Sequence, residues 1–269
     1  MTDGGRDMVT GYVVRRTTDA LGRIGDMSVI TIEGFRRTWD VRTWFWEFVH
    51  QCWFLARVTS LPVLLVSLPL GATVALQVGE LAWQLGASSA TGGAVVVGLV
   101  REVAPMASAL LIAGAGGSAM TSDIGARNIR DELAAMEVMA VNPIHRLVTP
   151  RLWAASTVAV LLVPLVIVAG AAGGYFFNVI IQGVTPGAYF DGALSLLVTS
   201  DLLVTLLKAW IFGFIAAIMA CYFGMTCQTS PVGVGRAVNQ STVVTFVLVF
   251  AVNYVITMIY FLAYPPRAL

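Results

Sequence analysis

Polar residues that interrupt long apolar stretches are the side chains of this sequence best suited to chemistry. Arg101 and Glu102 are adjacent in one such stretch, Lys208 lies near the start of another, and Asn253 lies inside a third. At a helical rise of about 1.5 Å per residue, these side chains lie at a similar depth, about 10 to 15 Å from one end of their helices. A charge at that depth is costly unless it is paired or faces water, and such residues commonly mark a transport path. We therefore predict a polar site to which three helices contribute.

The same residues also permit a purely structural interpretation. Glu102 could form a buried ion pair with either Arg101 or Lys208, and such a pair would need no ligand. The glycine-rich runs at 114–118 and 170–174 favour close packing of helices over a ligand site. Both interpretations of the polar residues remain open at this point.

A second candidate site lies in the polar segment from Asp123 to Pro143. Apolar residues recur there at helical spacing, and Asn142-Pro143 is a stop signal, so the segment predicts a short amphipathic helix. That helix could rest on the membrane, or it could dock its methionine-containing stripe into a groove of a cytosolic partner. The residues assigned to the docking surface are Arg130, Asp131, Glu132, Leu133, Met136, Glu137 and Met139.

The composition shows what kind of fold must position these residues. Of 269 residues, 58% are hydrophobic and 12% are charged, which leaves too little polar surface to coat a soluble globule. The net charge of +1 and the lack of a basic run speak against a nucleic-acid-binding protein. The sequence therefore predicts an all-α integral membrane protein.

Hydropathy and length predict five transmembrane helices after one interfacial helix. Aromatic and charged residues alternate from Val41 to Val58, a texture typical of the headgroup boundary. The linker 183–199 is expected to hold a short helix outside the membrane. The predicted domains are a cytosolic tail (1–40), a membrane domain (41–262) and a short external tail (263–269). The predicted spans are Ser60–Leu81, Ala94–Met120, Leu147–Ile181, Leu202–Met225 and Val238–Leu262.

Basic residues set the expected orientation. Thirteen of the sixteen fall in the first 58 residues, in the loop 121–152 or in the loop 226–237, which the five-span arrangement places on one side. The positive-inside rule makes that side cytoplasmic. We expect a multi-pass protein of the inner (plasma) membrane with its N-terminus in the cytoplasm.

Motifs for catalysis are not found in the sequence. A P-loop needs a lysine followed by Ser or Thr, but Lys208, the only lysine, is followed by Ala209. There is also no G-x-S-x-G elbow and no H-E-x-x-H helix, and the cysteines and histidines are not spaced as metal ligands. We predict a non-catalytic chain with no cofactor or metal of its own.

Several segments, taken in order over residues 45 to 262, resemble the MlaE/YrbE permease family, most closely the YrbE permeases of actinobacterial Mce lipid-transport systems. These segments are Arg101 to Pro105 (REVAP), Ala109 to Ser118 (ALLIAGAGGS), Asp131 to Pro143 (DELAAMEVMAVNP), Pro150-Arg151, Cys221 to Gly224 (CYFG) and Gly233 to Ala237 (GVGRA). The chain departs from the family pattern at Ala115 and Gly116, where an Arg is usual, at Ala134, where an acid is usual, and at Asn253, where an Asp is common.

The resemblance implies a function and a set of partners. It implies a permease that pairs with a second, non-identical YrbE-type subunit and takes up lipid or fatty acid with MCE-domain proteins. A cytosolic ABC ATPase dimer would bind ATP and Mg²⁺ and grip the loop helix. The family's lipid cavity would be lined by Arg101, Glu102 and Lys208, and we place Asn253 there as well. Two alternatives remain, an ion-gradient-driven secondary transporter and a passive anchor for envelope proteins.

Overall fold

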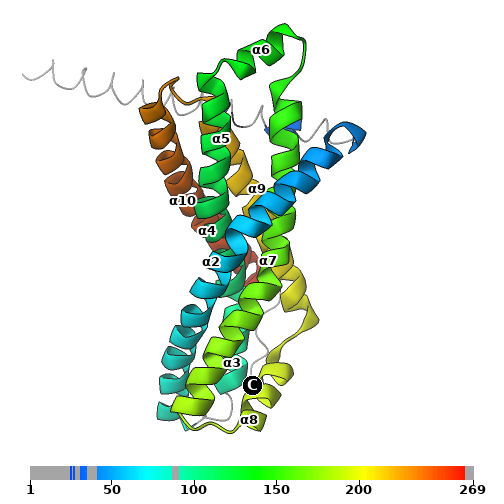
Figure 1. Ribbon diagram of the computed structural model, residues 1–269. Coiled ribbons are helices and arrows are strands. Elements are labelled where there is room, and N and C mark those ends of the chain that lie inside the picture. Colours follow the sequence, from blue (N-terminus) through cyan, green and yellow to red (C-terminus); the bar gives the residue numbers. More distant parts are fainter. Residues whose placement is uncertain (1–24, 26, 28–30, 35–40, 87–90, 264–269) are drawn as a thin grey trace, which may run out of the picture.

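Every element in the described part of the chain is a helix. The computed structural model describes residues 25, 27, 31–34, 41–86 and 91–263, and no strand occurs among them (Figure 1). Most of the predicted tails, 1–40 and 263–269, and part of the turn after the first span lie outside these residues. Five helices are long and apolar enough to cross a membrane, which confirms the predicted fold class. They are Trp44–Ala82, Thr91–Ile129, Ile144–Ile181, Thr199–Met225 and Pro231–Leu262.

The first span differs from prediction because it is continuous with the aromatic segment before it. Helix α2 runs unbroken from Val41 to Gln84 and includes Pro62 and Pro69. The hydroxyl of Thr59 donates to the carbonyl of Leu55, four residues earlier, at 2.7 Å, so this polar side chain is satisfied within the helix. The expected interfacial helix is therefore the first part of α2 and not a separate element.

The second span alternates α-helical and wider π-helical turns. Its parts are α3 (Thr91–Gly98), η2 (Leu99–Val103), α4 (Ala104–Leu111), η3 (Ile112–Gly117) and α5 (Ser118–Ile129). In η2 the amide of Ala104 donates to the carbonyl of Leu99, five residues earlier. Such wide turns are rare and often occur at functional sites.

The remaining elements follow the predicted order. After α6 (Glu132–Val138), the third span comprises η4 (Ile144–Val148), α7 (Thr149–Tyr175) and η5 (Phe176–Ile181), and α8 (Pro186–Leu196) is the short helix expected in the linker. Helix α9 spans Thr199–Met225. Helix α10 covers Pro231–Ala263 and so begins earlier than the predicted Val238, because Pro231 and the Ser230 hydroxyl, which accepts from the Gly233 amide at 3.0 Å, start it in the predicted loop.

Glycines let α2 and α7 cross at close range (Figure 1). A Cβ built on Gly71 would lie 1.9 Å from the carbonyl oxygen of Gly170, and one on Gly173 would lie 2.1 Å from that of Leu68. Two helix backbones can approach so closely only where the residues at the contact are glycines, which have no side chain. The run at 170–174 thus serves packing, as its composition indicated.

The ends of the helices sort into two groups (Figure 1). Helix α6, the end of α5 and the start of α10 lie at one end of the molecule, whereas α3 and α8 lie at the other. The loops at 121–152 and 226–237 therefore share one end, as the charge-based orientation requires.

Candidate functional site

The polar site forms around the π-helical turn η2. Pro105 has no amide hydrogen, so the carbonyl of Arg101, four residues earlier, loses its usual helical donor. The ammonium group of Lys208 donates to that carbonyl at 3.1 Å, and the hydroxyl of Thr205 donates to the carbonyl of Val100 at 2.9 Å. Side chains of α9 thus satisfy backbone groups that the wide turn leaves free.

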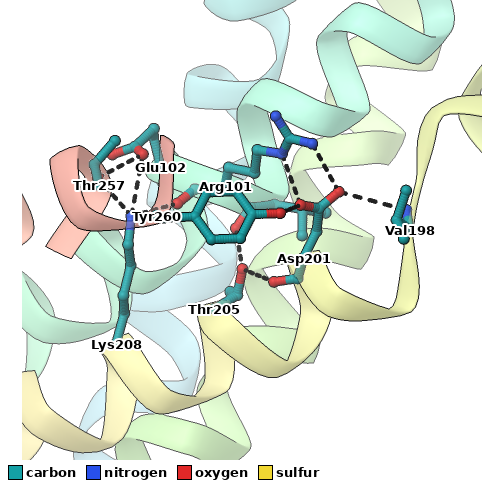
Figure 2. Close-up of polar contacts among 9 residues, drawn as sticks. Arg101, Glu102, Val198, Asp201, Thr205, Lys208, Thr257 and Tyr260 are labelled. Carbon is teal, nitrogen blue, oxygen red and sulfur yellow. Dashed lines mark hydrogen bonds and ion pairs between the residues drawn. The ribbon is translucent and has the colours of Figure 1, made fainter. Parts of the chain in front are cut away.

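Glu102 is the centre of a first network, which includes three of the four predicted residues; Figure 2 shows its contacts with Lys208 and Thr257. The Nζ of Lys208 lies 3.1 Å from Oε1 of Glu102, and Lys208 is only 2% exposed. Asn253 donates its amide to Oε2 of Glu102 at 2.8 Å. Thr257 accepts from Lys208 at 2.8 Å and donates to Glu102 at 3.0 Å. Of the two ion pairs that the sequence left open, the structure forms Glu102–Lys208.

Arg101 belongs to a second network (Figure 2). Its Nε and Nη2 donate to the two carboxylate oxygens of Asp201 at 2.9 and 3.0 Å, which is a bidentate pair. The hydroxyl of Tyr260 donates to the same carboxylate at 2.5 Å, and the Arg101 guanidinium lies 5.7 Å from the centre of the Tyr260 ring. The amide of Val198 makes a fourth, longer bond at 3.4 Å. The Asp201 side chain is completely buried.

Asp201, Thr205, Thr257 and Tyr260 were missed by the sequence reasoning, although a signal was present. Asp201, Thr205 and Lys208 are separated by four and three residues, so they share one face of a helix. Asn253, Thr257 and Tyr260 repeat that spacing in α10. Polar residues that repeat along one face of two neighbouring spans indicate a hydrogen-bonded network between those spans, whereas isolated charges do not.

The networks fill the space between the helices. The free volume among their side chains is about 10 Å³, room for about one water molecule at most. The ion pairs thus form within one chain, with the Arg101 and Glu102 side chains partly exposed, and the lipid-lining role of Arg101, Glu102, Lys208 and Asn253 stays a prediction. Within the described residues, no three His, Cys, Asp or Glu side chains are grouped to hold a metal ion.

The loop between the second and third spans is built differently from prediction. The short helix expected between the second and third spans is present as α6, but it covers only part of 123–143, because α5 continues the second span to Ile129 and α6 begins at Glu132. Asp131 between them has a φ of 55°, a left-handed conformation that interrupts the helix. Arg130 and Glu132 bridge the break with an ion pair of 2.7 Å. The hydrogen bond from Arg130 lowers the pKa of Glu132.

Helix α6 projects from the bundle and borders a groove. The groove has a volume of about 710 Å³, and Leu133 and Glu137 of the predicted docking surface line it, together with Val141 and Ile144. Met139 is 66% exposed at the end of α6. Arg130 and Asp131 are exposed, and Met136 is half-buried. The predicted residues therefore share one projecting element, and their docking role stays a prediction.

Five helices that are long and apolar enough to cross a membrane, with paired charges inside them, define a polytopic membrane protein. Residues 48–259 match the model of the family described as Permease MlaE, so the chain belongs to that family. This confirms the family suggested by the sequence motifs.

Relatives from distant organisms are similar over most of the chain. The intermembrane phospholipid transport system permease protein MlaE of Haemophilus influenzae is 30% identical, with 90% of this chain and 92% of that protein aligned. A probable ABC transporter permease protein of Rickettsia bellii is 28% identical over 94% of this chain and 98% of its own length. The chloroplastic protein TRIGALACTOSYLDIACYLGLYCEROL 1 of Arabidopsis thaliana is 25% identical over 66% of this chain and 51% of its own length.

Proposed function

We propose that this chain is the membrane-spanning permease subunit of an ATP-driven phospholipid transporter of the Mce type. The observation that carries the proposal is family membership over residues 48–259, together with similarity over nine-tenths of the chain to a permease named for phospholipid transport. The charged networks inside the spans support it, because intramembrane charges commonly lie on transport paths. The chain itself carries out no catalysis in this scheme.

Energy enters through the α6 loop in this proposal. A separate cytosolic ABC ATPase dimer binds ATP and Mg²⁺, docks on α6 and moves it as a rigid body. The exposed Val138 and Met139 and the groove beside Leu133 and Glu137 offer both apolar and charged contacts to such a partner. The movement reaches the polar networks through α5, which continues the span that contains Arg101 and Glu102.

The rest of the assembly is proposed from the same family membership. In this proposal a second, non-identical YrbE-type permease completes the lipid path, and the space of about 10 Å³ among the polar networks of one chain is far too small for a lipid. MCE-domain proteins pass lipid or fatty acid to this pair for uptake across the cell envelope. The N-terminus lies in the cytoplasm, on the side of the basic loops.

Charge reversal in α6 tests the coupling. Glu137→Lys should lower the amount of ATPase that co-purifies, because Glu137 lines the groove and has no ion pair among the described residues. Glu132→Lys should do the same, but it also breaks the pair with Arg130. Glu80→Lys, an exposed change at the far end of α2, is the matched control and should leave co-purification unchanged. Normal ATPase recovery with Glu137→Lys would contradict the docking surface.

A secondary transporter is the alternative that the paired charges also fit, since coupled ions often move through such groups. Lipid transport in vesicles distinguishes the two. Transport that stops on ATP depletion supports the permease, whereas transport that survives it and stops with a protonophore supports the alternative. A passive anchor for envelope proteins would show no transport in either condition.

A further inference from the structure

Every cation of the polar site is already paired within the chain. Among the described residues that line it, Lys208 pairs with Glu102 and Arg101 pairs with Asp201. An anionic headgroup that approaches therefore meets no uncompensated positive charge. To gain a full ionic contact it must displace one of the two carboxylates.

Arg101 is the cation whose carboxylate partner, Asp201, an anionic headgroup could displace. Its side chain is 31% exposed, compared with 3% for Lys208. Asp201 uses only Nε and Nη2, and the described residues provide no partner for Nη1 (Figure 2). A guanidinium binds carboxylate and phosphate with the same planar pair of donors, so one can replace the other without rebuilding the site.

We propose that Asp201 competes internally with the lipid phosphate for Arg101 and thereby keeps an anionic headgroup releasable. This inference rests on the proposed function. A transporter must bind its cargo and also let it go, and an uncompensated arginine in a membrane would hold a phosphate too firmly. The ion pair between Asp201 and Arg101 forms again when the phosphate leaves.

Hydrogen bonds from other residues would stabilise the Asp201 carboxylate while Arg101 binds a phosphate. When Arg101 turns away, the hydroxyl of Tyr260 and the amide of Val198 still donate to it. These bonds stabilise the charge and hold the carboxylate at the start of α9, within reach of Arg101. Glu102 is less suited to the same role, because Lys208 is buried and also bonded to Thr257 and the Arg101 carbonyl.

The test is lipid retention by the Asp201→Asn variant. Asparagine keeps Oδ1 as an acceptor for Tyr260, replaces the oxygen that accepts from Val198 with an amide nitrogen, and removes the competing charge. The full chain, purified with its natural partners in nanodiscs containing phosphatidylglycerol, is washed and its retained lipid is measured by mass spectrometry. We expect about tenfold more phosphatidylglycerol on Asp201→Asn than on the natural protein, with slower ATP-driven release. Diacylglycerol, which lacks the phosphate, should be retained equally by both.

Tyr260→Phe is the matched control. It removes one hydrogen bond from the same carboxylate but leaves the charge, so Asp201 should compete as well or better and retention should be equal or lower. Simple loss of packing would move both variants in the same direction. If Asp201→Asn does not assemble, increased retention by Tyr260→Phe would by itself overturn the proposal.

The other outcomes separate this inference from the proposed function. If the natural protein retains phospholipid and Asp201→Asn retains no more, the competitor role fails and the transporter stands. If the natural protein retains no phospholipid at all, the proposed function fails. If inorganic phosphate displaces the extra lipid from Asp201→Asn, the site recognises free phosphate and the assignment to a lipid headgroup is overturned.

Discussion

A single proline, Pro105, frees a backbone carbonyl group that becomes part of the polar site. Pro105 cannot donate to the carbonyl of Arg101, and the ammonium group of Lys208, 3.1 Å away, takes the place of the missing amide. This contact ties α9 to η2 through the backbone, independently of the Glu102 ion pair. Lys208 therefore has a structural role whatever ligand the protein carries.

Replacing Glu102 measures the worth of the ion pair. Glu102→Ala leaves the buried Lys208 without a counter-charge, and we expect a loss of about 2 kcal/mol in the free energy of unfolding, since the Glu102 side chain is 39% exposed. Glu102→Gln keeps an acceptor for Lys208 and should lose less. Thermal unfolding in detergent checks both. Equal midpoints for the two variants would show that the charge, and not the hydrogen bond, accounts for the stability.

The candidate residues could be predicted from the sequence, but their partners could not. Arg101, Glu102, Lys208 and Asn253 stand out because charge and amide groups are costly in apolar spans. Adjacent Arg101 and Glu102 join different networks, because successive helical residues point in different directions. Which acid each cation meets depends on the rotation of α9 and α10, and one sequence does not contain that rotation.

At the scale of the elements, the crossing of α2 and α7 depends on missing side chains. Gly71→Ala should destabilise the protein by about 1 to 3 kcal/mol, because the new methyl group would meet the backbone of Gly170. Gly98→Ala is the control, since no atom outside the local helix lies within 4 Å of its Cβ position. It should be neutral or slightly stabilising. The midpoints of thermal unfolding compare the two, and a neutral Gly71→Ala would contradict the close crossing.

Alanine-to-glycine substitution should have opposite effects on the stability of α6 at two positions, one just after the helix and one inside it. Ala140 has a φ of 57°, which costs an alanine about 1 kcal/mol, so Ala140→Gly should slow hydrogen exchange in α6. Ala135→Gly, inside the helix, should speed it by a similar free energy. Hydrogen-deuterium exchange of the peptide that covers 130–143 measures both. Faster exchange in both variants would argue against the left-handed turn at Ala140.

Element boundaries were harder to predict than element types. Residues 41–58 and the first span differ in composition, yet nothing between them ends a helix, so the backbone continues as α2. The start of α10 was placed too late, because Pro231 and two glycines suggested a loop, although proline is favoured in the first turn of a helix. Hydropathy locates the apolar centre of a helix, whereas capping groups set its ends.

At the scale of the whole molecule, the arrangement predicts which residues face the cytoplasm. In a variant whose native cysteines are replaced by alanine, Val138→Cys in α6 should react with a membrane-impermeant thiol reagent only from the cytoplasmic side. Gly187→Cys in α8 should react only from outside, because α6 and α8 lie at opposite ends (Figure 1). Labelling of intact cells and of inverted vesicles reads this out. Reaction of both cysteines from the same side would contradict the five-span arrangement.

The wide turn at Leu99–Val103 also makes this segment sensitive to the deletion of single residues. An α-helix advances by about 100° per residue, so removing one residue there would restore regular winding and rotate one half of the span against the other. The guanidinium would then swing away from its carboxylate, or α5 would turn its buried side outward. Single-codon deletions in this stretch should therefore be far more damaging than conservative substitutions at the same positions, despite its plain apolar surroundings.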